Sequence, residues 1–88
     1  MASIKNLKKD IDYTLGDILD ITNLTAGLNS DVDEAKTEAI RNEIFEVYDD
    51  LIAKVNAKNV ENKKAHFKAI SVELEEKANT LIDKVNAL

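Results

Sequence analysis

The stretch LIAKVNA at residues 51–57 returns thirty residues later as LIDKVNA at residues 81–87, with one change. The same shift of thirty matches further identical residues, which are Asn29 and Asn59, Ala35 and Ala65, Ala39 and Ala69, Ile40 and Ile70, Glu43 and Glu73, and Glu46 and Glu76. Residues 29–58 and 59–88 are therefore two copies of one unit. Because copies of a repeat are equivalent supersecondary units, we expect both to adopt the same structure.

Composition restricts the fold class to all-α. The 88 residues include no proline and only two glycines, Gly16 and Gly27, so the turn residues of an all-β protein are missing. There is no cysteine either, which excludes a disulfide framework and a thiolate metal site. A chain of this length forms one domain, residues 1–88, with a modest core.

The first predicted helix spans about residues 3–26, with Ser3 as its cap. Apolar residues follow at spacings of three and four, which places them on one face: Ile4, Leu7, Ile11, Leu15 and Ile18. Gly16 falls on the opposite, outward side. Gly27 suits the left-handed position just after a helix, with Leu28 covering the last turn.

The second predicted helix spans residues 31–57, and Asp31 followed by Glu34 has the form of a capping box at its start. Its apolar face is formed by Ile40, Ile44, Val47, Tyr48, Leu51 and Val55, with Phe45 and Ile52 at one border. This face is wider than the stripe of a two-stranded coiled coil. The second helix therefore needs two neighbouring helices.

The third predicted helix spans residues 60–87 and repeats the same face. Its members are Phe67, Ile70, Leu74, Ala78, Leu81, Val85 and Leu88, with Ile82 at the border. Apolar periodicity is lost between Val55 and Phe67, which indicates a turn near residues 58–60 where Asn59 takes a left-handed or capping conformation. The alternative is one continuous helix over residues 31–88.

Three helices with short connections predict an up-down-up three-helix bundle. The segments SIKNLKKDIDYTLGDIL and LIAKVNAKNVENKKAHFKAI are similar to small all-helical proteins of Bacteroidetes-type bacteria. That resemblance covers most of the chain. The family it suggests has no assigned activity, so the resemblance implies an all-helical fold and no site residues.

No catalytic motif can be assembled from this sequence, and we expect neither an enzyme nor a cofactor. His66 is the one histidine, and a histidine on a bundle helix is typical of phosphotransfer domains. Their His-x-x-Lys-Gly-x-Ser pattern is not matched, because Ala69 and Ile70 stand where lysine and glycine are required. A histidine at the solvent edge of the core is the favoured interpretation. A carboxylate metal centre is not expected, since Lys63 stands where a Glu-x-x-His pair needs an acid.

A contact surface is predicted on the outer side of the first helix, where Tyr13, Ile21, Leu24 and Leu28 carry apolar surface away from the core. These residues could contact a partner helix or a second copy in a weak dimer. The alternative is a scatter of single exposed apolar residues, which is normal for a protein surface.

A basic end is also predicted, because the bundle topology gathers the start of the first helix, the end of the second and the start of the third. The candidate anion-binding residues there are Lys5, Lys8, Lys9, Lys58, Lys63, Lys64, His66 and Lys68, with Lys54 nearby, while Asp17, Asp20, Asp31, Asp33, Glu34 and Glu38 gather at the other end. We expect weak, salt-sensitive binding of a phosphate-bearing ligand or acidic partner. The alternative is a solvated lysine fringe.

The sequence therefore favours a non-enzymatic helical module for protein interaction or self-association. The second hypothesis is a histidine phosphotransfer or anion-binding signalling domain that uses His66 and the neighbouring lysines. A net charge of −5 disfavours nucleic acid as a partner, and no apolar run reaches the length of a membrane span, so we expect a cytoplasmic protein.

Overall fold

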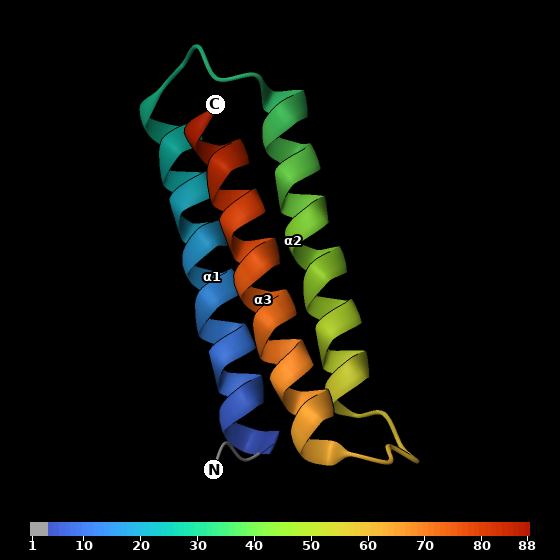
Figure 1. Cartoon of the computed structure of the whole chain (residues 1–88). Helices are drawn as coiled ribbons and strands as arrows, with labels where there is room; N and C mark the ends of the chain where they lie inside the picture. Colours follow the sequence, from blue (N-terminus) through green and yellow to red (C-terminus); the bar gives the residue numbers. More distant parts are fainter. Residues whose placement is uncertain (1–3) are drawn as a thin grey trace.

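The structure, a computed structural model, describes residues 4–88, with the backbone alone for Ile4. It contains α1 (Ile4–Leu28), α2 (Glu34–Val55) and α3 (Lys63–Asn86). The helices run up, down and up, so α1 and α3 are parallel and α2 is antiparallel to both (Figure 1). Every pair of helices is in contact, within a rod of 49 × 20 × 16 Å. The predicted all-α three-helix bundle is confirmed.

The core consists of the three predicted apolar faces. Its buried apolar members are Leu7, Ile11, Leu15, Ile18, Ile40, Ile44, Val47, Leu51, Val55, Ile70, Leu74, Ala78, Leu81 and Val85. Leu19, Tyr48, Ile52, Phe67 and Leu88 are partly buried against them. The side chains of Ser3 and Ile4 lie outside the described part of the chain, so the predicted cap and the first core position are not described.

Two threonines belong to the core as well, and the apolar pattern did not predict them. Thr22 and Thr37 are fully buried. The Thr22 hydroxyl donates to Ile18 O at 2.7 Å, and the Thr37 hydroxyl donates to Asp33 O at 3.1 Å. Each hydroxyl is satisfied by the backbone one turn earlier, which lets a polar residue occupy an apolar position.

The connection between α1 and α2 differs from the prediction. The helix continues through Gly27 to Leu28, and no described glycine has a positive φ, so the expected left-handed end at Gly27 is wrong. Asn29 makes the turn instead, because its side-chain oxygen accepts from Asp31 N at 3.0 Å. The predicted capping box at Asp31 is also wrong, because Asp31 lies in the turn that Asn29 forms and not at the start of the helix. Asp33 is the cap of α2, and its carboxylate accepts from Ala35 N at 2.9 Å.

The connection between α2 and α3 confirms the predicted turn and excludes one continuous helix. Asn59 is left-handed, with a φ of 63°, as its predicted role requires. The helix then starts later than residue 60, since Asn62 is the cap of α3 and its side-chain oxygen accepts from Ala65 N at 3.1 Å.

Gly16 was predicted to face outward, and a Cβ added there would meet open space, although the residue is only partly exposed. It is half-buried and lines a shallow hollow of about 200 Å³ between α1 and α2, together with Leu19, Phe45 and Tyr48. The Asp12 carboxylate also lines this hollow, and hydrogen bonding to it, together with burial, raises the pKa of Tyr48 above its ordinary value of 10.0. Tyr48 is therefore half-buried rather than part of the interior, because its polar tip needs a partner.

Candidate functional sites

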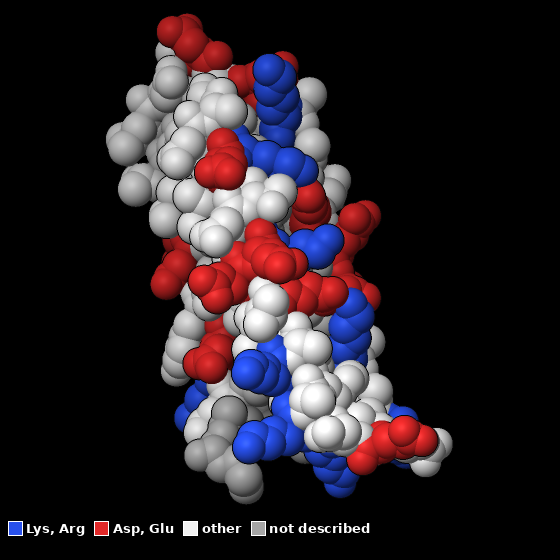
Figure 2. All heavy atoms as spheres, viewed as in Figure 1, with Lys and Arg blue, Asp and Glu red and all other residues white. Residues whose placement is uncertain are grey.

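The predicted basic end is present in the structure. The start of α1, the end of α2 and the start of α3 meet at one end of the rod (Figure 1). Residues 4–10 and 54–70, which form this end, contain eight of the twelve basic residues and two of the seventeen acidic ones. Lysine side chains crowd this end of the surface and acidic side chains dominate its middle (Figure 2). The opposite end, at the α1–α2 connection and the start of α2, carries Asp31, Asp33, Glu34 and Glu38 against Lys36 and Arg41, so positive charge is concentrated at one end and negative charge prevails over the rest of the rod.

Lys54 differs from the other lysines of this end, because it is paired. Its ammonium lies 2.7 Å from Glu73 Oε1 and 3.0 Å from Asp50 Oδ2. The hydrogen bonds to Glu73 and Asp50 raise the pKa of Lys54 above its ordinary value of 10.5. Within residues 4–88, no ion pair is formed by the seven other lysines of this end, Lys5, Lys8, Lys9, Lys58, Lys63, Lys64 and Lys68.

The loop between α2 and α3 encloses a hollow of about 390 Å³ at the basic end. Its lining includes the apolar residues Val55, Val60 and Phe67 and the lysines Lys58 and Lys63. The other lysines of the basic end do not line this hollow: Lys5, Lys8 and Lys9 lie on α1, and Lys64 and Lys68 lie on α3.

His66 is half-buried beside the end of α2, which agrees with the predicted position at the edge of the core. Its Nε2 lies 2.7 Å from Lys54 O, and its ring centroid lies 5.6 Å from that of Phe67. A carbonyl oxygen only accepts hydrogen bonds, so Nε2 carries the proton and donates it. This leaves Nδ1 as the ring nitrogen available for other chemistry.

The predicted contact residues on α1 are exposed. Tyr13 is 67% exposed, Ile21 49%, Leu24 60% and Leu28 79%. Three of them lie in the last third of α1, at the acidic end of the rod, and Tyr13 lies about three turns earlier on the same outer side. The sequence missed Ile82, which it placed at the border of the core and which is 40% exposed on the parallel helix α3.

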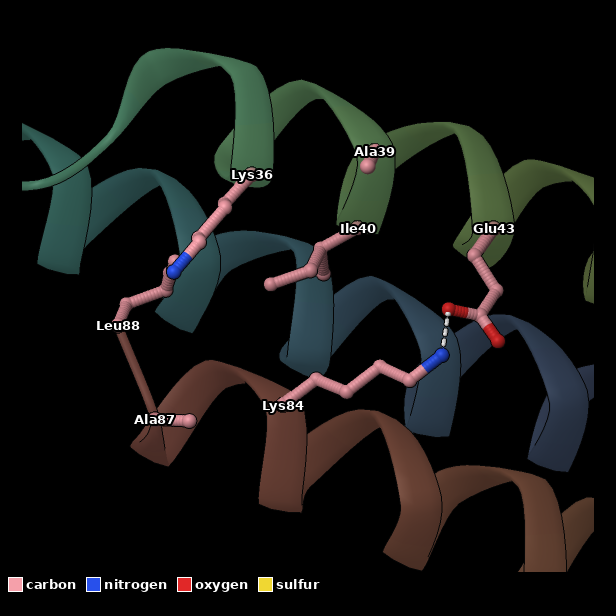
Figure 3. Close-up of a pocket in the computed structure, with 7 residues that line it drawn as sticks. All are labelled: Lys36, Ala39, Ile40, Glu43, Lys84, Ala87 and Leu88. Carbon is pink, nitrogen blue, oxygen red and sulfur yellow. Dashed lines mark hydrogen bonds and ion pairs between the residues drawn. The ribbon is translucent and has the colours of Figure 1, made fainter.

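A third hollow, which the sequence did not predict, lies between the start of α2 and the end of α3. Its volume is about 290 Å³, and it is lined by Lys36, Ala39, Ile40, Glu43, Lys84, Ala87 and Leu88. Lys36 extends from α2 toward Leu88, and Lys84 extends from α3 toward Glu43, so the two side chains flank the apolar centre at Ile40 (Figure 3). Lys84 Nζ lies 2.6 Å from Glu43 Oε2.

Comparisons with known proteins identify no relative. No protein family, curated protein or solved structure matches this chain.

Among residues 4–88, no three histidine or acidic side chains are placed to hold a metal ion. None of the three helices has an apolar run of the length and purity needed to cross a membrane, over the same described residues.

Proposed function

We propose that this protein is a non-enzymatic helical interaction module that associates weakly with a second copy of itself. The observation that carries this proposal is the exposure of Ile21, Leu24 and Leu28 on the outer side of α1, in a chain of only 88 residues. Several exposed apolar residues on one side of a helix are typical of a contact site. Tyr13 adds exposed apolar surface closer to the middle of the rod, and Ile82 is exposed on the parallel helix α3.

The charge distribution supports a second copy as the partner. In an antiparallel pair, the basic end of one copy lies beside the acidic end of the other, so the two rods attract each other at both ends. A two-fold axis at the level of Ile18 and Leu19 of α1 would bring Tyr13 of one copy close to Leu24 of its partner. Asp17 and Asp20 lie between these residues and are exposed, so like charges approach across the axis and keep the dimer weak.

Sedimentation of the full chain at increasing concentration tests this function. We expect association that weakens in high salt, because opposite charges at the two ends are screened. Leu24→Glu should abolish association. Val72→Glu, which adds the same charge at another exposed apolar residue, on α3, should leave it unchanged. A monomer at every concentration, or equal effects of both substitutions, would contradict the proposal.

Anion binding at the basic end is the second candidate function, and the seven lysines without an ion pair favour it. Neither α1 nor α3 has an acidic residue in its first turn, where acids stabilise a helix and lysines do not. The lysines at these positions therefore do not stabilise the two helices, which favours a role in binding. Phosphotransfer through His66 has less support, because Nε2 is engaged with Lys54 O.

An NMR titration with inorganic phosphate at low ionic strength tests this candidate function. We expect amide shifts confined to residues 4–9 and 57–68, and their loss in Lys58→Gln/Lys63→Gln. The control Lys36→Gln/Lys77→Gln removes the same charge away from the basic end and should keep the shifts. Shifts spread over the chain, or equal loss in both variants, would reject an anion site.

A further inference from the structure

The repeat gives the pair α2 and α3 two equivalent niches, one of which is filled and one open. The open niche is the hollow of Figure 3. A shift of thirty residues relates its seven lining residues to their counterparts, which are Lys36 to His66, Ala39 to Ala69, Ile40 to Ile70, Glu43 to Glu73, Leu88 to Lys58, Lys84 to Lys54 and Ala87 to Ala57. Five of the seven pairs are identical.

In the niche that we call filled, the ring of His66 is half-buried beside the end of α2. Its Nε2–H donates to Lys54 O at 2.7 Å. The same carbonyl accepts from Ala57 N at 3.2 Å, so one helix-end oxygen receives both donors. The niche therefore combines an apolar wall with a backbone acceptor at the end of a helix, and an imidazole satisfies both.

The open niche has the same acceptor in the same setting. Lys84 O, the counterpart of Lys54 O, accepts from Ala87 N at 3.2 Å, the distance found in the filled niche. The flanking ion pair also recurs, because Lys84 bonds to Glu43 as Lys54 bonds to Glu73. The difference is that Lys36 stands where the filled niche has His66. No ring is supplied by the chain itself, and the hollow stays open.

We propose that this open niche binds a neutral imidazole ring, presented by a histidine of a partner protein, whose N–H donates to Lys84 O. The ammonium groups of Lys36 and Lys84 flank the space, and Glu43 is already paired with Lys84, so a charged imidazolium is disfavoured. A volume of about 290 Å³ suits one side chain and is small for a larger ligand. The partner is a different protein, because the single histidine of this chain is engaged in its own filled niche.

An NMR titration of the full chain with imidazole at about pH 8.5, where the ring is neutral, tests the proposal. We expect amide shifts confined to residues 36–43 and 84–88. Lys36→His supplies the ring of the other repeat and should abolish these shifts. Lys36→Gln removes the same charge without supplying a ring and should keep them. Shifts that spread over the surface, persist in Lys36→His or disappear in Lys36→Gln would overturn the proposal.

A matched pair of ligands tests the hydrogen bond separately. 1-Methylimidazole has the same ring but no N–H, so it should bind about fivefold more weakly than imidazole, as expected for the loss of one hydrogen bond. Equal affinity of the two compounds would contradict a donor bond to Lys84 O. If the wild type is dimeric, both titrations use the Leu24→Glu variant, in which self-association is removed. The result for the niche then does not depend on the proposed dimer.

Discussion

Lys84 of the second repeat bonds to Glu43 of the first at 2.6 Å, and the reverse contact, from Lys54 of the first to Glu73 of the second, measures 2.7 Å. Each lysine and each glutamate has its counterpart thirty residues away. Reciprocal contacts of this kind are what a two-fold axis between α2 and α3 produces, as in the interface of a symmetric dimer. The antiparallel pair of helices is therefore an internal pseudo-dimer, and α1 completes the bundle without a repeat partner.

Equivalent ion pairs should make equivalent contributions to stability. Double-mutant cycles on Lys84 with Glu43 and on Lys54 with Glu73 should each give a coupling energy of about 0.3–1 kcal/mol, because all four side chains remain partly exposed. Urea unfolding measures both. The single substitution Lys54→Ala should cost more than Lys84→Ala, since Lys54 also bonds to Asp50 at 3.0 Å. Coupling in one cycle alone would contradict the two-fold relationship.

The contribution of Lys54 should depend on pH. Its pKa is raised in the folded state by the hydrogen bonds to Glu73 and Asp50, so the stability it adds is present below the unfolded value of 10.5 and is lost as pH rises through the folded pKa. The difference in unfolding free energy between wild type and Lys54→Met should be constant between about pH 7 and 9 and should fall as the pH rises above 10.5. A difference that persists at the highest pH would contradict this assignment.

The two leucines of the repeated stretch should respond alike to truncation. Leu51 is 0% exposed and Leu81 is 1% exposed, at equivalent positions of the two copies. Leu51→Ala and Leu81→Ala should each lower the free energy of unfolding by about 2–4 kcal/mol, through lost burial and a new cavity. Urea unfolding of both variants checks this. Ile82→Ala is the control, and it should cost far less because Ile82 is 40% exposed.

The core and the topology could be predicted because they depend on periodicity and on connection length. The spacing of apolar residues identified every buried apolar residue of the core, but it did not identify the two buried threonines. Thr22 and Thr37 were missed because their burial depends on a bond to the backbone one turn earlier, which polarity alone conceals. Asp33 was missed as the cap of α2 because Asp31 offers the same chemistry two residues earlier, and the choice depends on how Asn29 shapes the turn.

The candidate sites could be predicted only where they depend on topology. The gathering of lysines followed from topology, since helix direction alone decides which ends meet. The pairing of Lys54 with Glu73 could not be predicted, because it depends on how α2 and α3 are rotated about their axes. The open niche could have been predicted from a difference between the two copies of the repeat. Lys36 aligns with His66 in the repeat, so the two copies differ at the one position that fills the space.

We expect both glycines to lower the stability of α1, because neither one occupies a turn that requires glycine. Gly16 and Gly27 lie inside α1, neither has a positive φ, and a Cβ added to either would meet no atom within 4 Å. Gly16→Ala and Gly27→Ala should therefore each raise the free energy of unfolding by about 0.5–1 kcal/mol, because alanine loses less backbone entropy in a helix. The effects should add, since the two positions lie three turns apart.

Asn59 provides the contrasting case for this prediction. Its φ of 63° lies in the left-handed region, so Asn59→Ala should lower the free energy of unfolding by about 1 kcal/mol, whereas Asn59→Gly should be neutral or stabilising. Urea unfolding of the four variants separates the two situations. If Gly27→Ala destabilised the protein while Asn59→Ala did not, the chain would turn at Gly27 as its sequence suggested, and the end of α1 would differ from the one described.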